Sequence, residues 1–141
     1  MLPLAIMPIA WVHALGNKLG LVAFYLLKGF RKRTLSNLSL AHGIVHDEKH
    51  LIKLAKASFQ NLAITALEYG KIPFVKDINT LITCENPEKA KAIIQEGKGL
   101  IFFVGHQANW ELLFLSGTTF MPGVAIGRPV KNKFIYDYVV R

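Results

Sequence analysis

Apolar residues along the chain recur mostly at the spacing of an α-helix. The clearest example follows Asp47, where apolar positions fall three and four residues apart as far as Tyr69. Asp47 is a suitable N-cap for this helix, and Gly70 lies just past its expected end. Residues 31–41 predict a shorter helix before it, with Gly43 as the stop signal. The first half of the chain is therefore expected to be helical.

Short apolar runs in the second half lack the helical period. They occupy residues 81–84, 99–104 and 124–126. The first two have the length of a buried strand, and the third is a shorter candidate strand. Helical patterns separate the runs: one begins at Asn86, with Pro87 at its first helical position, and ends near Gly97, one begins at Asn109, and another covers residues 132–140. Strands that alternate with helices favour a parallel sheet. The predicted fold class is α/β, with a membrane-associated N-terminal helix and a helical region followed by a partial, mostly parallel sheet covered by helices.

Residues 1–30 are apolar and carry only two charges, Lys18 and Lys28. A cleaved signal peptide places its basic residues before the apolar stretch, whereas here they follow it. Residues 9–27 are long enough to cross a bilayer, and a helix lying at the interface would tolerate the proline breaks. We favour a membrane-anchoring helix over a buried core helix, and either mode of anchoring fits. The predicted domains are an anchor at 1–30 and an α/β domain at 31–141.

Basic residues are concentrated beside this apolar segment. The formal net charge is +8, and every charged residue before Asp47 is basic: Lys18, Lys28, Arg31, Lys32 and Arg33. A basic cluster next to an apolar helix favours contact with anionic lipid, and the positive-inside rule then places the rest of the chain in the cytoplasm. Nucleic acid is not an expected partner, because no basic stripe with interleaved aromatic residues is present.

The strongest candidate for chemistry is the pair His106 and Glu111. The apolar run ends just before His106, and the next helix is expected to start near Asn109. The histidine would then lie at the carboxyl end of a strand and the carboxylate in the first turn of a helix, where α/β enzymes often have their sites. A carboxylate on one ring nitrogen leaves the other available to accept a hydroxyl proton. The structural alternative is that both residues only cap and orient the turn.

A second histidine cluster is weaker. His42, His46 and His50 recur every four residues, as metal ligands on one helix face would. Gly43 and the expected N-cap at Asp47 interrupt that helix between them. No metal site is therefore expected there.

The segment His106-Gln107-Ala108-Asn109-Trp110-Glu111 resembles the His-x4-Asp/Glu block of glycerolipid-type acyltransferases. Its Asn-Trp-Glu ending is similar to the late acyltransferases of bacterial lipid A biosynthesis, the lauroyl/myristoyl transferase family. Further segments resemble the same family in the same order: Leu2-Pro3 before an apolar helix, Phe59-Gln60-Asn61-Leu62, and Gly127-Arg128-Pro129-Val130-Lys131-Asn132. The resemblance covers essentially all 141 residues. Ala108 departs from it, because the family commonly has glycine there.

This resemblance implies an acyltransferase at the bacterial inner membrane, with its catalytic part on the cytoplasmic side. His106 would act as general base on a hydroxyl of a lipid A precursor, and Glu111 would orient it. Arg128, assisted by Lys131, would bind phosphate of the acceptor or of the carrier's phosphopantetheine. The acyl donor would be a thioester on acyl carrier protein, and neither a metal nor another cofactor is implied.

Two alternatives stay open. In the first, the enzyme acylates a phospholipid or a glycolipid. In the second, the chain is an inactive, truncated remnant of such an enzyme. The second alternative arises because a sheet of only three strands would leave an apolar edge exposed. We therefore expect the chain to be an N-terminal fragment of a longer acyltransferase, and the sequence downstream of codon 141 would test this.

Overall fold

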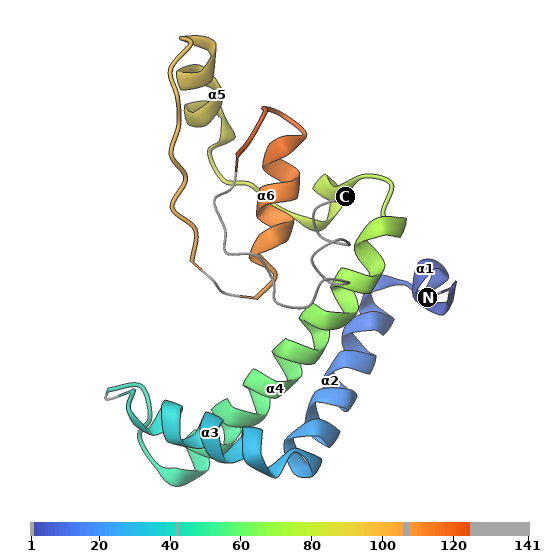
Figure 1. Cartoon of the computed structure of the whole chain (residues 1–141), viewed down its shortest axis with the longest axis vertical. Coiled ribbons are helices and arrows are strands. Elements are labelled where there is room, and N and C mark those ends of the chain that lie inside the picture. Colours follow the sequence, from blue (N-terminus) through green and yellow to red (C-terminus); the bar gives the residue numbers. More distant parts are fainter. Residues whose placement is uncertain (1, 42, 106–107, 125–141) are drawn as a thin grey trace.

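Helices α2 (Ile9–Leu26) and α4 (Glu48–Lys71) lie side by side and form the long body of the molecule (Figure 1). The computed structural model describes residues 2–41, 43–105 and 108–124. The other elements are α1 (Leu2–Ile6), α3 (Lys28–Ser39), η1 (Ile72–Phe74), η2 (Ile78–Leu81), α5 (Pro87–Gln95) and α6 (Trp110–Thr118), of which η1 and η2 are 3-10 helices. The start of α6 lies near the C-terminal end of α4, and α5 lies farther out (Figure 1).

Predicted helix boundaries are confirmed where a capping residue defines them. Asp47 accepts a hydrogen bond from the backbone N–H of His50 at 2.6 Å, and α4 begins directly after it. Helix α5 begins at Pro87, whose fixed φ suits the first helical position. The predicted stops, Gly43 and Gly97, have φ angles of +84° and +72°, which glycine adopts without strain.

Two glycines bring the backbones of α2 and α4 almost into contact. A Cβ added to Gly20 would lie 2.6 Å from the backbone nitrogen of Gln60, and one added to Gly16 would lie 2.8 Å from Cα of Ile64. Side-chain carbons do not approach backbone atoms this closely, so glycine is required at both positions. Because Gly16 lies opposite Ile64 and Gly20 opposite Gln60, the two helices run antiparallel.

The buried core lies where α2, α3 and α4 meet. Phe24, Ala55 and Phe59 are buried together, and the rings of Phe24 and Phe59 pack edge to face with centroids 5.5 Å apart. Arg31 of α3 and Lys56 of α4 lie 5.6 and 5.7 Å from the centroid of the Phe24 ring. Cation–π attraction at that distance adds to the apolar packing. This cluster fixes the N-terminal helices to α4.

One face of α2 is left uncovered. Helix α2 falls inside the predicted anchor, and among the described helices it is long and apolar enough to cross a membrane. Its buried residues face α4: Val12, Gly16, Gly20 and Phe24. The exposed large apolar residues of α2 are Trp11, Leu15, Leu19, Val22, Tyr25 and Leu26. An apolar surface of this kind marks an interaction with a membrane or another protein.

The predicted parallel sheet is wrong for the part of the chain that the structure describes, which contains helices and irregular segments but no strand. Residues 81–84 are the end of η2 followed by irregular backbone. The 99–104 run is also irregular, and its Ile101 and Phe103 are 84% and 96% exposed. A strand needs a neighbour for its backbone N–H and C=O groups, and no described segment pairs with either run. The apolar composition of these two runs therefore suggested buried strands. It did not show whether a neighbouring strand is present to form the backbone hydrogen bonds of a sheet.

Two further predicted elements fall largely outside the described residues. Of the strand expected at 124–126, only Val124 is described, and it is exposed and irregular. The helix expected at 132–140 lies wholly outside the described residues.

Candidate active site

The predicted catalytic motif leads into α6. Glu111 lies in the first turn of this helix and is partly buried. Asn109 occupies the predicted N-cap position, although its side chain makes no capping hydrogen bond. His106, Arg128 and Lys131 lie outside the described residues. Of the predicted site residues, the structure therefore places Glu111 and defines its surroundings.

Tyr69, in the last turns of α4, lies beside the Glu111 carboxylate. The two side chains are close enough to interact, and the phenolic O–H is the group that can donate, because an ionised carboxylate can only accept. Burial raises the pKa of Tyr69, and the nearby carboxylate of Glu111, as hydrogen-bond acceptor and negative charge, raises it further. Tyr69 is therefore a neutral phenol at physiological pH and can donate to Glu111.

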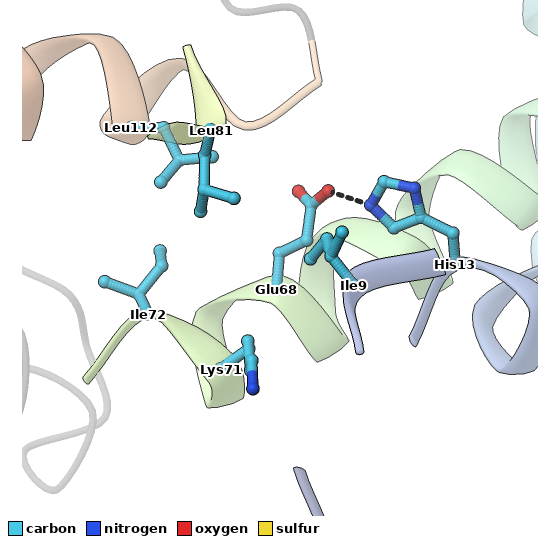
Figure 2. Close-up of a pocket in the computed structure, with 7 residues that line it drawn as sticks. All are labelled: Ile9, His13, Glu68, Lys71, Ile72, Leu81 and Leu112. Atoms are coloured by element: carbon cyan, nitrogen blue, oxygen red, sulfur yellow. Dashed lines mark hydrogen bonds and ion pairs between the residues drawn. The ribbon is translucent and has the colours of Figure 1, made fainter. Parts of the chain in front are cut away.

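Glu68, the neighbour of Tyr69, joins α6 to α2. Its Oε1 accepts a hydrogen bond from Nε2 of His13 at 2.7 Å, and its Oε2 accepts one from Nδ2 of Asn109 at 3.1 Å. Figure 2 shows the carboxylate of Glu68 extending from α4 toward the ring of His13. The side chain of Glu68 is only 16% exposed, and a carboxylate with so little water around it needs such donors. Two adjacent side chains at the end of α4 thus contact the start of α6.

A small cavity lies beside the pair of His13 and Glu68 (Figure 2). Its lining residues are Ile9, His13, Glu68, Lys71, Ile72, Leu81 and Leu112. The cavity measures about 70 Å³, which is room for a few water molecules. Small-molecule sites measure about 300–1,000 Å³, so this cavity does not hold an acyl chain.

The far end of α6 is fixed by η2. Asn79 accepts a hydrogen bond from Oγ of Ser116 at 2.6 Å, and its Nδ2 donates one to Oγ1 of Thr119 at 3.3 Å. Ser116 is buried at 7% exposure, so its hydroxyl depends on this partner. Helix α6 therefore makes side-chain contacts at both ends, which suits a helix that carries a predicted catalytic residue.

Ala108 has a backbone φ of +48° just before α6. This angle lies in the left-handed region, which glycine adopts without strain. A Cβ in that region costs about 1–2 kcal/mol. The turn that leads into the helix of Glu111 is therefore strained by the methyl group of Ala108.

Replacing Ala108 with glycine is expected to stabilise the protein by about 0.5–1 kcal/mol. The relief of left-handed strain exceeds the added chain entropy of glycine in the unfolded state, which is about 0.4–1 kcal/mol. Chemical denaturation would measure the free energy of unfolding. Ala92→Gly, in the exposed face of α5, is the control and should destabilise by about 1 kcal/mol. Equal losses in both variants would show that the φ of Ala108 is not strained.

The described histidines do not gather with acidic residues into a metal site. Among the described residues, no group of three or more His, Cys, Asp or Glu side chains is arranged to hold a metal ion. The rings of His46 and His50 stack with centroids 5.3 Å apart, and His42 lies outside the described residues.

The sequence pattern did not single out His13, Glu68 or Tyr69. A signal for Glu68 was present, because it follows Gln60 and Ile64 at four-residue spacing, on the face of α4 that packs against α2. A carboxylate on a packed helix face requires a donor on the neighbouring helix. The register of the two helices was needed to identify that donor as His13.

A family model described as bacterial lipid A biosynthesis acyltransferase matches residues 1–141. The protein is therefore an acyltransferase, an enzyme of lipopolysaccharide biosynthesis. The chain belongs to the bacterial lipid A biosynthesis acyltransferase family, as its His-x4-Glu block and flanking segments predicted. No match was found among curated proteins or among solved structures.

Proposed function

We propose that this protein moves a fatty acyl chain from a thioester on acyl carrier protein to a hydroxyl group of a lipid A precursor. The match of all 141 residues to the lipid A acyltransferase family carries this proposal. The position of Glu111 at the start of a helix with side-chain contacts at both ends supports it. The acceptor hydroxyl belongs to a 3-hydroxyacyl chain that is already attached to the precursor.

His106 acts as the general base in the proposed reaction. It takes the proton of the hydroxyl while the oxygen attacks the thioester carbonyl. An ester C–O bond forms, the C–S bond breaks, and the proton passes to the departing thiolate. Glu111 orients the imidazole and stabilises its charged form, and Tyr69 beside it can donate to the carboxylate. The reaction needs no covalent acyl-enzyme.

Arg128 and Lys131 bind phosphate in this proposal. A guanidinium donates two parallel hydrogen bonds to phosphate oxygens, so Arg128 suits the phosphate of the lipid A precursor or of the carrier's phosphopantetheine. Lys131 adds a second positive charge three residues later. Both substrates are acidic, and the basic N-terminal region would attract them as well.

The proposal is tested with the complete reading frame that contains these residues, purified in detergent. The enzyme is incubated with an acyl thioester on acyl carrier protein and two acceptors, a lipid A precursor and a phospholipid. Mass spectrometry is expected to show the gain of one acyl chain on the lipid A precursor. Transfer to the phospholipid alone would replace the proposed acceptor, and transfer to neither would contradict the proposed activity.

The membrane anchor in this proposal is α2, within residues 1–30, at the cytoplasmic face of the inner membrane. An 18-residue helix is about 27 Å long, slightly short of a hydrocarbon core of about 30 Å. Helix α4 covers one side of α2, and Lys18 is exposed on α2. A helix embedded along one face tolerates both features, because the lysine reaches the headgroups. The basic residues of α3 then lie near anionic lipid.

Leu26→Gln is expected to weaken binding to vesicles that contain anionic lipid by about tenfold. Burying one leucine side chain contributes about 1.5–3 kcal/mol, and about 1.4 kcal/mol corresponds to a factor of ten. Flotation with vesicles measures the bound fraction. Leu62→Gln, on α4, is the matched control, since Leu26 and Leu62 are 72% and 70% exposed. Equal losses of binding in the two variants would argue against α2 as the membrane-embedded face.

A further inference from the structure

Glu68 contacts two helices at once through its two carboxylate oxygens. His13 of α2 donates to Oε1 at 2.7 Å, and Asn109, the residue before α6, donates to Oε2 at 3.1 Å. The three residues are far apart in the sequence, and two of them, His13 and Glu68, line the cavity shown in Figure 2. That cavity is too small for an acyl chain, so the junction does not serve to bind one.

We propose that Glu68 is a positioning residue for acyl transfer, which fixes the start of α6 against α2 and thereby the position of Glu111. This inference rests on the proposed function, in which Glu111 orients His106. Asn109 and Glu111 lie within one turn at the start of α6. Glu68 contacts Asn109, and the next residue of α4, Tyr69, lies beside Glu111. These two contacts fix the start of the helix that carries the Glu111 carboxylate.

The carboxylate of Glu68 can only accept hydrogen bonds. Asn109 must therefore turn its amide nitrogen, and not its amide oxygen, toward Glu68 on α4. The Oδ1 atom of Asn109 is buried and has no hydrogen-bond partner among the described residues. The bond to Glu68 is consequently what orients this side chain. The same carboxylate binds His13 of α2, so the apolar N-terminal helix and the helix of Glu111 share one polar contact.

The test exchanges the carboxylate of Glu68 and the amide of Asn109 between the two positions. Asn109→Asp would place a second carboxylate where Nδ2 now lies 3.1 Å from Glu68, and the two would repel. We expect kcat to fall about 100-fold with KM changed less than twofold, because a displacement of about 1 Å costs on that order. Adding Glu68→Gln restores a donor to Asp at position 109, and the glutamine oxygen still accepts from His13. The double variant should regain at least tenfold in kcat.

Glu48→Gln is the matched control for the second substitution. It makes the same chemical change on the same helix, in the exposed first turn of α4. Combined with Asn109→Asp, it should regain no activity. All variants are assayed in the complete reading frame, at a temperature where circular dichroism shows each of them to be folded.

The outcomes separate this inference from the proposed function. Recovery of kcat by Glu68→Gln and not by Glu48→Gln supports the positioning role. A double variant no faster than Asn109→Asp, or a loss of rate that only follows the folded fraction, overturns it. Failure of the unmodified enzyme to transfer an acyl chain would instead overturn the proposed function.

Discussion

His106→Ala is expected to reduce acyl transfer by at least about a hundredfold, and by as much as ten-thousandfold. General base catalysis contributes a rate factor of about 10²–10⁴, and alanine retains no group that accepts the hydroxyl proton. The loss should appear in kcat, because the base acts in the transition state and not in the binding of the substrates. The initial rate of transfer from the acyl carrier protein thioester measures it.

The control for this variant is His46→Ala. His46 is exposed and contacts the ring of His50, away from α6, so its removal should leave the transfer rate within about twofold of the unmodified enzyme. Vesicle binding should be unchanged in both variants. Turnover of His106→Ala at the rate of the control would exclude a general base at this position.

Gly20→Ala is expected to destabilise the fold by about 2–3 kcal/mol. The added methyl group would lie 2.6 Å from the backbone nitrogen of Gln60 and the carbonyl oxygen of Phe59. Neither atom can move without separating α2 from α4, and overpacking of this kind typically costs about 1–3 kcal/mol. The midpoint of chemical denaturation, followed by circular dichroism in detergent micelles, measures the change.

Gly29→Ala is the matched control for the helix contact. Gly29 lies in α3, and a Cβ added there meets nothing within 4 Å. Alanine should therefore stabilise α3 by up to about 1 kcal/mol through its higher helix propensity. If both variants change stability in the same direction and amount, close packing of α2 on α4 is not what requires glycine at position 20.

Local signals in the sequence predicted the boundaries of several helices. The carboxylate of Asp47, the fixed φ of Pro87 and the left-handed glycines Gly43 and Gly97 each act on their own backbone. No distant residue is needed for these effects, so the sequence alone was sufficient. The position of Glu111 in a first helical turn followed from the same reasoning.

Features that depend on distant contacts were not predicted. The runs at 81–84 and 99–104 have the composition of strands, but a strand forms only beside another strand, and none is found in the described ranges. The contact of Glu68 with His13 and Asn109 likewise depends on the antiparallel register of α2 and α4. That register is set by Gly16 and Gly20. In the sequence alone, these glycines are only residues of low helix propensity, and nothing near them in the chain shows that another helix packs against them.

In the proposed mechanism, acyl transfer to a lipid A precursor depends on His106. The decisive experiment quantifies, in the same reaction, the ester formed on the precursor and the thiol released from acyl carrier protein. We expect one ester for each thiol in the unmodified enzyme, and a loss of both products by at least about a hundredfold in His106→Ala. Thiol release without ester formation, or equal ester formation in both proteins, would show that the mechanism is wrong.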